Sequence, residues 1–230
     1  MRWLPAAKRP ITFAVHQDEI GAYAKAYPGC NLLVLSDHCR KHTGLVRKEI
    51  LETVRQPFFF VDDDIRITLK DATSVEAVFD TLQKHLDEGV SMAGLGQQLF
   101  SNNVMTGFIN GDFSAIRNRF VATVYGINPL DFDTCPLEQL PVYEDMALVY
   151  HAVQRGGGTI TSYCATHSNV SPPIGGCNSW RDPKITIDSL NALVRLYPDI
   201  CSIRTTNKTT HSQHIGIGLR TAWSKLKKLS

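Results

Sequence analysis

The fold class of this chain is predicted chiefly from the stretch Phe58-Phe-Phe-Val-Asp-Asp-Asp-Ile65. Its four apolar residues predict a buried strand, and three carboxyl groups follow directly at the carboxyl end of that strand. Clustered carboxylates repel each other unless a cation lies among them, and oxygen ligands suit Mg²⁺ or Mn²⁺. If the strand continues, alternation points Asp62 and Asp64 to the same side. The alternative is an acidic turn or a helix cap that follows an ordinary strand.

Upstream of this stretch, apolar strands alternate with helices. Strands are expected at 11–15 and 31–35, and helices at 18–27 and 43–56, where Pro57 ends the second helix. Apolar strands joined by helical crossovers predict a parallel sheet that is covered on both faces. We therefore expect an α/β protein with a mixed, mostly parallel central sheet flanked by helices. Ligands of such sheets bind at the carboxyl ends of the strands.

Downstream, helical spacing, apolar runs and turn residues predict the remaining elements. They are helices at 74–88, 143–155, 188–197 and 220–229, a strand at 159–163, more strands between 91 and 125 with a break at 110–112, and loops at 131–141 and 168–181.

Composition predicts a globular chain, because 43% of its 230 residues are hydrophobic and 20% are charged. We expect one domain at 1–202 and a basic tail at 203–230 that contains no acidic residue. Its cationic residues are Arg204, Lys208, Arg220, Lys225, Lys227 and Lys228. Such a tail suits contacts to DNA phosphates, although a merely solvated C-terminus is an equal alternative.

The six cysteines are scattered along the chain, without a C-x-x-C pair. This spacing argues against a disulfide framework or a structural zinc site and favours reduced thiols. The sequence contains neither an apolar signal-like segment nor a run near the roughly 20 residues that span a bilayer. We therefore expect a soluble, cytoplasmic protein.

Glu144 and Asp145 open a predicted helix, which allows two interpretations. Acidic residues in a first helical turn commonly do no more than complement the helix dipole. Downstream of an acidic metal-binding strand, however, a carboxylate is also a candidate general base for an attacking hydroxyl.

His167 follows the predicted strand at 159–163 and precedes a Gly- and Pro-rich segment. A neutral imidazole is a good ligand for Mn²⁺-like metals, which makes His167 a candidate metal ligand. A structural role for this single histidine is an equal alternative.

In their order along the chain, these motifs resemble those of the GT-A glycosyltransferases, especially the inverting ones. The resemblance covers roughly residues 11–181, and 47–64 is the most family-like piece. It implies a Rossmann-like GT-A fold, a nucleotide-sugar donor and a divalent metal. The resemblance implies that the donor is contacted by His16, Asp37, Arg47, Asp62 and Asp63, with Asp37 on the nucleoside base. It implies that Asp64 ligates the metal together with Asp62 and His167. It also implies that Asp145, beside Glu144, acts as the general base.

Within that group the chain is similar to the phage TET-associated glycosyltransferases. This similarity rests on 58–64, 108–113 and 175–181, and it implies hydroxymethylated pyrimidines in DNA as acceptors. It also implies acceptor contacts from Asn110, Asp112 and Trp180 and a donor contact from Arg181, although Trp180 also suits a loop anchor. If a phage encodes the chain, its location is the host cytoplasm. The Q-x-x-R-W signature of processive synthases is absent from the sequence, so polymer synthesis is not expected.

The expected reaction is transfer of glucose from UDP-glucose to 5-hydroxymethylcytosine, with Mn²⁺ or Mg²⁺ and with inversion. One alternative is a nucleotidyltransferase, but the Gly-rich loop typical of that class is missing at 15–18. The other is a non-catalytic DNA-binding protein with a degenerate core, against which the intact acidic motifs argue.

Overall fold

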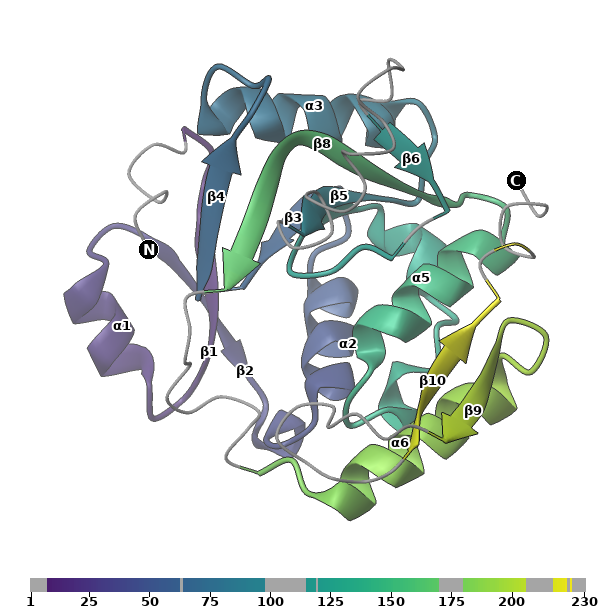
Figure 1. Cartoon of the computed structure of the whole chain (residues 1–230). Helices are drawn as coiled ribbons and strands as arrows, with labels where there is room; N and C mark the ends of the chain where they lie inside the picture. Colours follow the sequence, from purple (N-terminus) through teal and green to yellow (C-terminus); the bar gives the residue numbers. More distant parts are fainter. Residues whose placement is uncertain are drawn as a thin grey trace.

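A computed structural model of the chain describes residues 8–62, 64–97, 115–118, 120–169, 180–205, 217–222 and 224. Its central feature is a six-stranded mixed sheet with the order β3-β7-β5-β8-β4, in which β6 also pairs with β8 (Figure 1). The strands are β3 (Phe58–Val61), β4 (Ile65–Leu69), β5 (Met92–Gln97), β6 (Ala115–Arg117), β7 (Val124–Ile127) and β8 (Thr159–Asn169).

The predicted α/β class with a mixed central sheet flanked by helices is confirmed, but the expectation of mostly parallel pairing is wrong. Within the central sheet only β5 and β8 pair in parallel, and the other four pairings are antiparallel. The antiparallel pairs join strands that are distant in sequence, such as β3 with β7 and β4 with β8, so the strand–helix alternation near the N-terminus does not determine their direction.

The central sheet is curled, and the acidic run requires the curl. β3 and β4 stand at opposite ends of the strand order, yet only residues 62–64 connect them. In a flat sheet, four inter-strand steps would separate them by roughly 19 Å. The four peptide units from Val61 to Ile65 reach at most roughly 14 Å. The sheet therefore bends until its two outermost strands, β3 and β4, approach each other at the acidic run.

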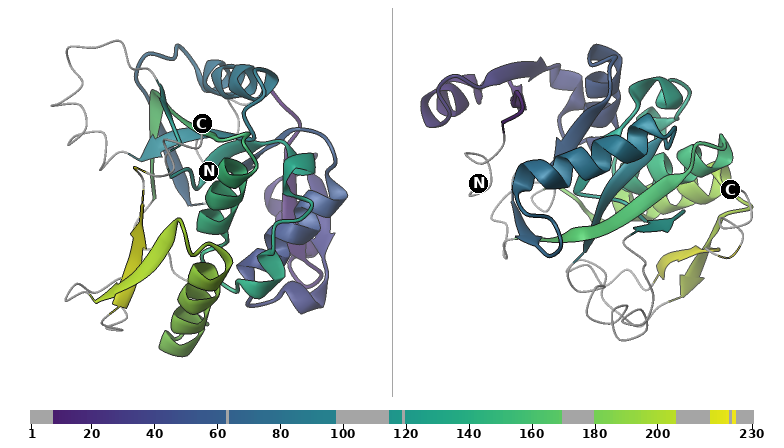
Figure 2. Two further views of the ribbon diagram at one scale, coloured as in Figure 1. Left: turned by 90° about the vertical axis from the view of Figure 1, so that its right-hand side faces the viewer. Right: turned by 90° about the horizontal axis from the view of Figure 1, so that it is seen from above.

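Helices cover both faces of this sheet, as Figure 2 shows. On one face α2 (Thr43–Thr53), α5 (Glu144–Gln154) and α6 (Pro183–Leu196) enclose a large apolar core with Phe60, Met92 and Ile127 of the sheet. On the other face α3 (Val75–Asp87) packs its Val78, Leu82 and Leu86 against Ala93, Leu95 and Val124. Among the described residues no helix is long and apolar enough to cross a membrane.

The first turn of α2 is fixed by two local features. The His42 imidazole caps the helix, accepting from the Leu45 N–H at Nδ1 (3.0 Å) while Nε2 lies 3.1 Å from the Glu138 carbonyl. A Cβ built at Gly44 would lie 2.2 Å from the Leu137 carbonyl oxygen, so only glycine allows this close approach. The capped turn brings Thr43 and Arg47 up to the start of α5.

Two smaller units flank the central layer. β1 (Thr12–His16) and β2 (Asn31–Leu35) form a parallel pair joined through α1 (Ile20–Ala26), at the left of Figure 1. β9 (Cys201–Thr205) and β10 (Ile217–Thr221) form an antiparallel hairpin beside α6. The 3-10 turns η2 (Asp37–Cys39), η3 (Pro129–Phe132) and η4 (Leu137–Gln139) complete the described elements; η3 overlaps the start of the predicted loop at 131–141, and η4 lies within it.

Three element predictions need correction. β8 extends to Asn169 rather than stopping at 163, because its second half pairs with β4. α6 begins at Pro183 rather than at 188, since the Asp182 carboxyl caps it by accepting from the Ile185 N–H at 2.7 Å. Arg220 and Thr221 belong to β10 rather than to a terminal helix, because 217–221 pairs with 201–205. The predicted break at 110–112 lies outside the described residues.

Candidate active site

The carboxyl ends of β3, β5 and β8 meet at one edge of the curled sheet. These three strands run in the same direction, since β3 and β5 are each antiparallel to β7 and β8 is parallel to β5. His167, near the end of β8, lies in register with Gln97 of β5 and Ile67 of β4. The acidic run follows β3 at this same edge. The strand ends at Val61, so the alternation expected for Asp62 and Asp64 does not apply.

Arg47 of α2 links acidic residues from two distant segments. Its Nη2 donates to Asp62 Oδ1 at 2.8 Å, and its Nε lies 4.0 Å from Glu144 Oε1. The guanidinium also lies over the Phe60 ring, 4.5 Å from the centroid. With 19% of its side chain exposed, Arg47 is a largely buried cation between the end of β3 and the start of α5.

Glu144 is held in place from α2. The Thr43 hydroxyl lies 2.6 Å from Glu144 Oε2 and 2.8 Å from the Pro141 carbonyl, and it donates its single proton to one of them. The Glu144 side chain is 12% exposed. Glu144 is therefore fixed by Thr43 and Arg47 of α2 in addition to its place in the first turn of α5.

Asp145 lies beside this group and has an unusual acidity. Burial and the neighbouring Glu144 carboxylate raise the pKa of Asp145 to about 7. The Met146 N–H, which donates to Asp145 Oδ1 at 2.7 Å, and the Arg47 charge offset only part of this rise. The helix-dipole interpretation of Asp145 therefore does not account for its environment, because a dipole contact alone would lower the pKa.

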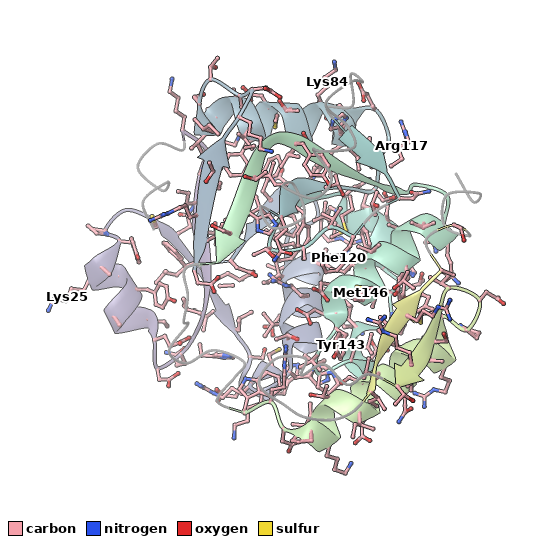
Figure 3. All side chains as sticks on the ribbon, viewed as in Figure 1. Lys25, Lys84, Arg117, Phe120, Tyr143 and Met146 are labelled. Carbon is pink, nitrogen blue, oxygen red and sulfur yellow. The ribbon has the colours of Figure 1, made fainter. Side chains whose placement is uncertain are left out.

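Two strained backbone positions border the acidic group. Tyr143, the residue before α5, has φ of 68°, and Thr123 has φ of 72°. Such conformations cost roughly 1–3 kcal/mol in a non-glycine residue, and a β-branched threonine rarely adopts them. The Thr123 carbonyl accepts from the Asp62 N–H at 3.0 Å, so this strained residue contacts the start of the acidic run directly. Figure 3 shows Tyr143 and Met146 at the start of α5, in the middle of the molecule.

Two polar atoms at this site are buried without a hydrogen-bond partner in the described part of the chain. They are the Tyr125 hydroxyl and Nδ1 of His167. Burial raises the pKa of Tyr125, and the charges of Arg47, Asp62, Glu144 and Asp145 all act on it. Native proteins rarely leave such atoms unpaired, so both are candidates for contact with a bound molecule.

His167 has the character expected of a metal ligand. Burial lowers the pKa of His167, although the nearby Asp62 charge and a hydrogen bond to the Leu95 backbone oppose that effect. The ring is therefore neutral near pH 7, as ligation requires. An unpartnered Nδ1 near a carboxylate, with the ring also engaged by a backbone carbonyl, fits a divalent cation.

The predicted ligands are nevertheless not gathered as tightly as a preformed cation site. Among the described residues the one group whose three donor atoms lie within 4.8 Å of one another is His38, Cys39 and Glu49. Asp62 already pairs with Arg47, and Asp64 lies in the turn before β4. Asp63 lies outside the described residues.

The other predicted donor contacts stand at the ends of β1 and β2. His16 ends β1 and has a buried, unpartnered Nδ1 among the described atoms. Asp37 follows β2, is 83% exposed, and accepts from Arg40 Nε at 3.1 Å. Because β1 and β2 are parallel and in register from Thr12 to His16, both residues lie at the same edge of that pair.

Trp180 and Arg181 precede α6, and Trp180 is half-buried. Arg181 lies close enough to Tyr143 for its charge to act on the pKa of that phenol, which burial raises. The predicted acceptor contacts Asn110 and Asp112 lie outside the described part of the chain.

A comparison with known protein families agrees with this geometry. The family described as TET-Associated Glycosyltransferase matches residues 4–148, which is more than half of the chain. The chain therefore belongs to the TET-associated glycosyltransferase family. No curated protein and no solved structure gave a significant match. The matched span contains β3, the acidic run, α2 and the first turns of α5, so it includes Arg47, Glu144 and Asp145.

Three residues of the site escaped the sequence analysis. Tyr125 lies in an ordinary apolar strand, and Thr43 reads only as the start of a helix. Thr123 contributes through its φ angle, for which its sequence gives no signal. Each acts through tertiary contacts, which a local pattern does not encode.

Proposed function

We propose that this TET-associated glycosyltransferase moves glucose from UDP-glucose to the hydroxymethyl group of 5-hydroxymethylcytosine in DNA. Family membership supports sugar transfer, and the TET association favours a hydroxymethylated base as the acceptor. The observation that carries the proposal is the gathering of Asp62 and Glu144 around Arg47 beside the buried Asp145, where burial and the Glu144 charge raise the pKa of Asp145. A general base works best when its pKa lies near the operating pH, and that of Asp145 is about 7.

In this proposal Asp145 removes the proton of the acceptor hydroxyl. The oxygen attacks C1 of the sugar from the face opposite the diphosphate, a C1–O bond forms, and UDP leaves with the electron pair of the broken bond. One displacement inverts the anomeric configuration. The negative charge of Glu144 assists by making Asp145 more basic than an isolated aspartate.

Arg47, Thr43 and Glu144 act as positioning residues. Arg47 neutralises part of the charge of Asp62 and Glu144, which keeps three carboxyl groups tolerable in one place. The Thr43 contact fixes Glu144, and through α5 it fixes the direction of Asp145. The unpartnered Tyr125 hydroxyl is available to donate to substrate in the same space.

The donor would lie across the strand ends. Asp37 and His16, at the ends of β2 and β1, are the proposed contacts of the uracil side. Asp62 and Asp63 would bind the ribose, and Arg181, beside Tyr143, would bind the diphosphate. A guanidinium is well suited to that task because it donates two parallel hydrogen bonds to phosphate oxygens.

Asp64, Asp62 and His167 would hold a divalent cation, Mn²⁺ or Mg²⁺. When bound, such a cation neutralises charge on a leaving diphosphate. His167 is suited to the role by its neutral, buried ring and its unpartnered Nδ1. Asp62 contributes a carboxylate that is 37% exposed.

The β9–β10 hairpin supports a DNA acceptor. Arg204 lies opposite Gly218, and Arg220 lies opposite Ser202. Residues directly opposite each other in the ladder point to the same face of the sheet, and so do residues two apart on one strand. The two pairs are two residues apart on each strand, so both arginines project from one face. Both are exposed. Two cations on one face of a hairpin suit contacts to consecutive phosphates, while Trp180, Asn110 and Asp112 are proposed for the extruded base.

The test is release of UDP from UDP-glucose with Mn²⁺, measured with and without 5-hydroxymethylcytosine DNA. We compare the wild type with Asp64→Ala and, as a matched control, with Asp71→Ala, an exposed acid beyond β4. The proposal expects release that rises with modified DNA, persists in Asp71→Ala and is lost in Asp64→Ala.

Donor hydrolysis without stimulation by DNA would retain the glycosyltransferase and reject the DNA acceptor. Release of pyrophosphate from a nucleoside triphosphate and a sugar phosphate would favour a nucleotidyltransferase instead. Absence of any metal-dependent turnover across a panel of nucleotide sugars would favour a DNA-binding protein with a degenerate core.

A further inference from the structure

A second polar cluster lies on the opposite side of α2 from Arg47 and its acidic partners. Cys39 Sγ lies 2.8 Å from Glu49 Oε2 and 3.7 Å from His38 Nε2. The Glu49 carboxylate also accepts from the backbone N–H and the hydroxyl of Ser36, at 3.0 and 2.8 Å. Glu49 is two residues beyond Arg47, which places their side chains about 200° apart around the helix. The two clusters are therefore separate.

The three donor atoms match the ligand preferences of one kind of metal ion. Thiolate, imidazole and carboxylate together are typical zinc ligands, whereas Mg²⁺ and Mn²⁺ prefer oxygen. Zinc bonds of about 2.0–2.3 Å in a tetrahedron put ligand atoms roughly 3.5 Å apart. The sulfur-to-nitrogen distance of 3.7 Å already fits. The sulfur-to-oxygen distance of 2.8 Å must lengthen by less than 1 Å once the proton between the two atoms leaves.

The environment of Cys39 distinguishes it from the other described cysteines. Its side chain is completely buried, yet it meets a carboxylate and an imidazole. Cys201 is also buried, but its thiol contacts only the backbone carbonyls of Leu193 and Tyr197. Cys135 contacts the Tyr197 hydroxyl at 4.0 Å. Only at Cys39, among the cysteines that the structure describes, do three different metal-binding side chains converge.

A reactive-thiol role for Cys39 does not fit its surroundings. Burial and the hydrogen bond to Glu49 raise the pKa of Cys39 to about 12, so without a cation it stays a protonated thiol at neutral pH. Nucleophilic and redox-active cysteines have the opposite environment, with a lowered pKa and solvent access. A bound cation would reverse this situation, because ligation deprotonates a thiol outright.

We propose that His38, Cys39 and Glu49 form a structural zinc site that fastens the end of β2 to α2. Binding breaks the S–H bond, releases that proton to solvent and forms a sulfur–zinc bond, while water completes the tetrahedron. The site holds the turn η2, which contains Asp37, against the helix that carries Arg47. Its role is to set the spacing of these two segments, and it does not depend on sugar transfer.

The sequence pattern argued against a structural zinc site because no two cysteines are closely spaced. The structure supplies the ligands differently, from two adjacent residues of the 3-10 turn η2 and one residue of the next helix, α2. Adjacent His and Cys are too common a pair for their spacing alone to indicate a metal.

The test is titration of the chelator-treated full chain with Co²⁺, followed by displacement with Zn²⁺. A thiolate ligand gives an intense near-ultraviolet charge-transfer band, which oxygen ligands at the acidic run do not give. We expect this band to saturate at one equivalent, to disappear with one equivalent of Zn²⁺ and to be absent in Cys39→Ser. It should persist in Cys30→Ser, the control for a half-buried thiol elsewhere.

Glu49→Gln and His38→Ala keep the thiol and guard against misfolding of Cys39→Ser. Each should retain a cobalt band but weaken cobalt binding by at least tenfold. Asp64→Ala should leave the band unchanged, so the zinc site is tested independently of the proposed transferase. Zn²⁺ should also raise the melting temperature of the wild type but not that of Cys39→Ser. Absence of a thiolate band at any Co²⁺ concentration, or a band lost in Cys30→Ser and kept in Cys39→Ser, would overturn the proposal.

Discussion

The two sides of α2 present carboxyl groups in opposite states. On the Glu49 side, hydrogen bonds from Cys39 and Ser36 outweigh burial and lower the pKa of the carboxyl. On the Arg47 side, burial and the Glu144 charge outweigh the available donors and raise the pKa of Asp145. α2 thus lies between two different carboxyl groups. The charged form of Glu49 is stabilised by its neighbours, whereas that of Asp145 is not.

This contrast favours the Arg47 side of α2 as the place of the chemistry. The Arg47 side also holds two backbone positions with positive φ and two buried polar atoms without a described partner. Strain and missing partners reduce stability and persist where a bound molecule completes the contacts. On the Glu49 side Lys41 also has a positive φ, of 57°, but none of the polar side chains of Ser36, His38, Cys39 and Glu49 is buried without a partner in the described part of the chain, which suits a structural role.

We expect the largest effect on activity from removal of the proposed general base, Asp145. Asp145→Asn removes the proton acceptor but keeps the shape and an oxygen for the Met146 N–H, so turnover should fall by roughly 10²-fold or more. The measurement is initial-rate UDP release with modified DNA. The control is Asp133→Asn, an exposed acid paired with Arg55, which should retain wild-type turnover. A rate within twofold of wild type for Asp145→Asn would return this residue to the helix-dipole interpretation.

The same substitution should stabilise the protein, and the gain should depend on pH. The folded pKa of Asp145, about 7, lies above its unfolded value near 3.8. Its contribution to stability is therefore fully present below about pH 4 and is lost as the pH rises through 7. Asp145→Asn removes that loss, so its advantage in unfolding free energy should open between pH 4 and 7 and reach at most about 4 kcal/mol. Urea unfolding at several pH values measures it, and a constant difference across this range would contradict the assigned acidity.

Replacement of the buried cation tests the other half of the site. Arg47→Met leaves Asp62 and Glu144 without their shared partner, and we expect unfolding to become easier by about 2 kcal/mol. Arg55→Met removes an ion pair to Asp133 that is exposed to solvent, so it should destabilise the protein much less than Arg47→Met. Equal losses for both variants, measured by urea unfolding at pH 7, would show that the acidic group is not buried as described.

The smallest effect concerns the unpartnered hydroxyl. Tyr125→Phe should change stability by less than about 0.5 kcal/mol, because it removes no described hydrogen bond. If the hydroxyl contacts substrate, kcat/KM should fall by about tenfold. Tyr150→Phe is the matched control, since that hydroxyl bonds Thr221 at 2.5 Å. It should lose about 1 kcal/mol of stability and no activity, and the reverse assignment of effects would contradict the account.

Much of the fold could be predicted from local pattern. The strands β1, β2 and β3 and the helices α2, α3 and α5 fall within a few residues of their predicted bounds, because apolar periodicity and caps determine them. The direction of pairing could not be predicted. It depends on β7 and β4 meeting strands distant in sequence, and nothing local to Val124 or Ile65 encodes that partner.

The candidate site divides in the same way. Arg47, Asp62, Glu144 and Asp145 could be selected because their residue types and order form a motif. Their individual roles could not be separated, since the pKa of Asp145 depends on burial beneath a folded sheet. Cys39 and Glu49, ten residues apart, became a candidate pair only when the structure brought η2 against α2.

The central claim is that the acidic group between β3 and α5 carries out sugar transfer with Asp145 as the base. The most direct measurement is the intact mass of a 5-hydroxymethylcytosine oligonucleotide after incubation with UDP-glucose, Mn²⁺ and either wild-type protein or Asp145→Asn. We expect one added hexose per modified base with the wild type and almost none with the variant over the same time. No added mass across a panel of nucleotide sugars, or equal addition by both proteins, would contradict it.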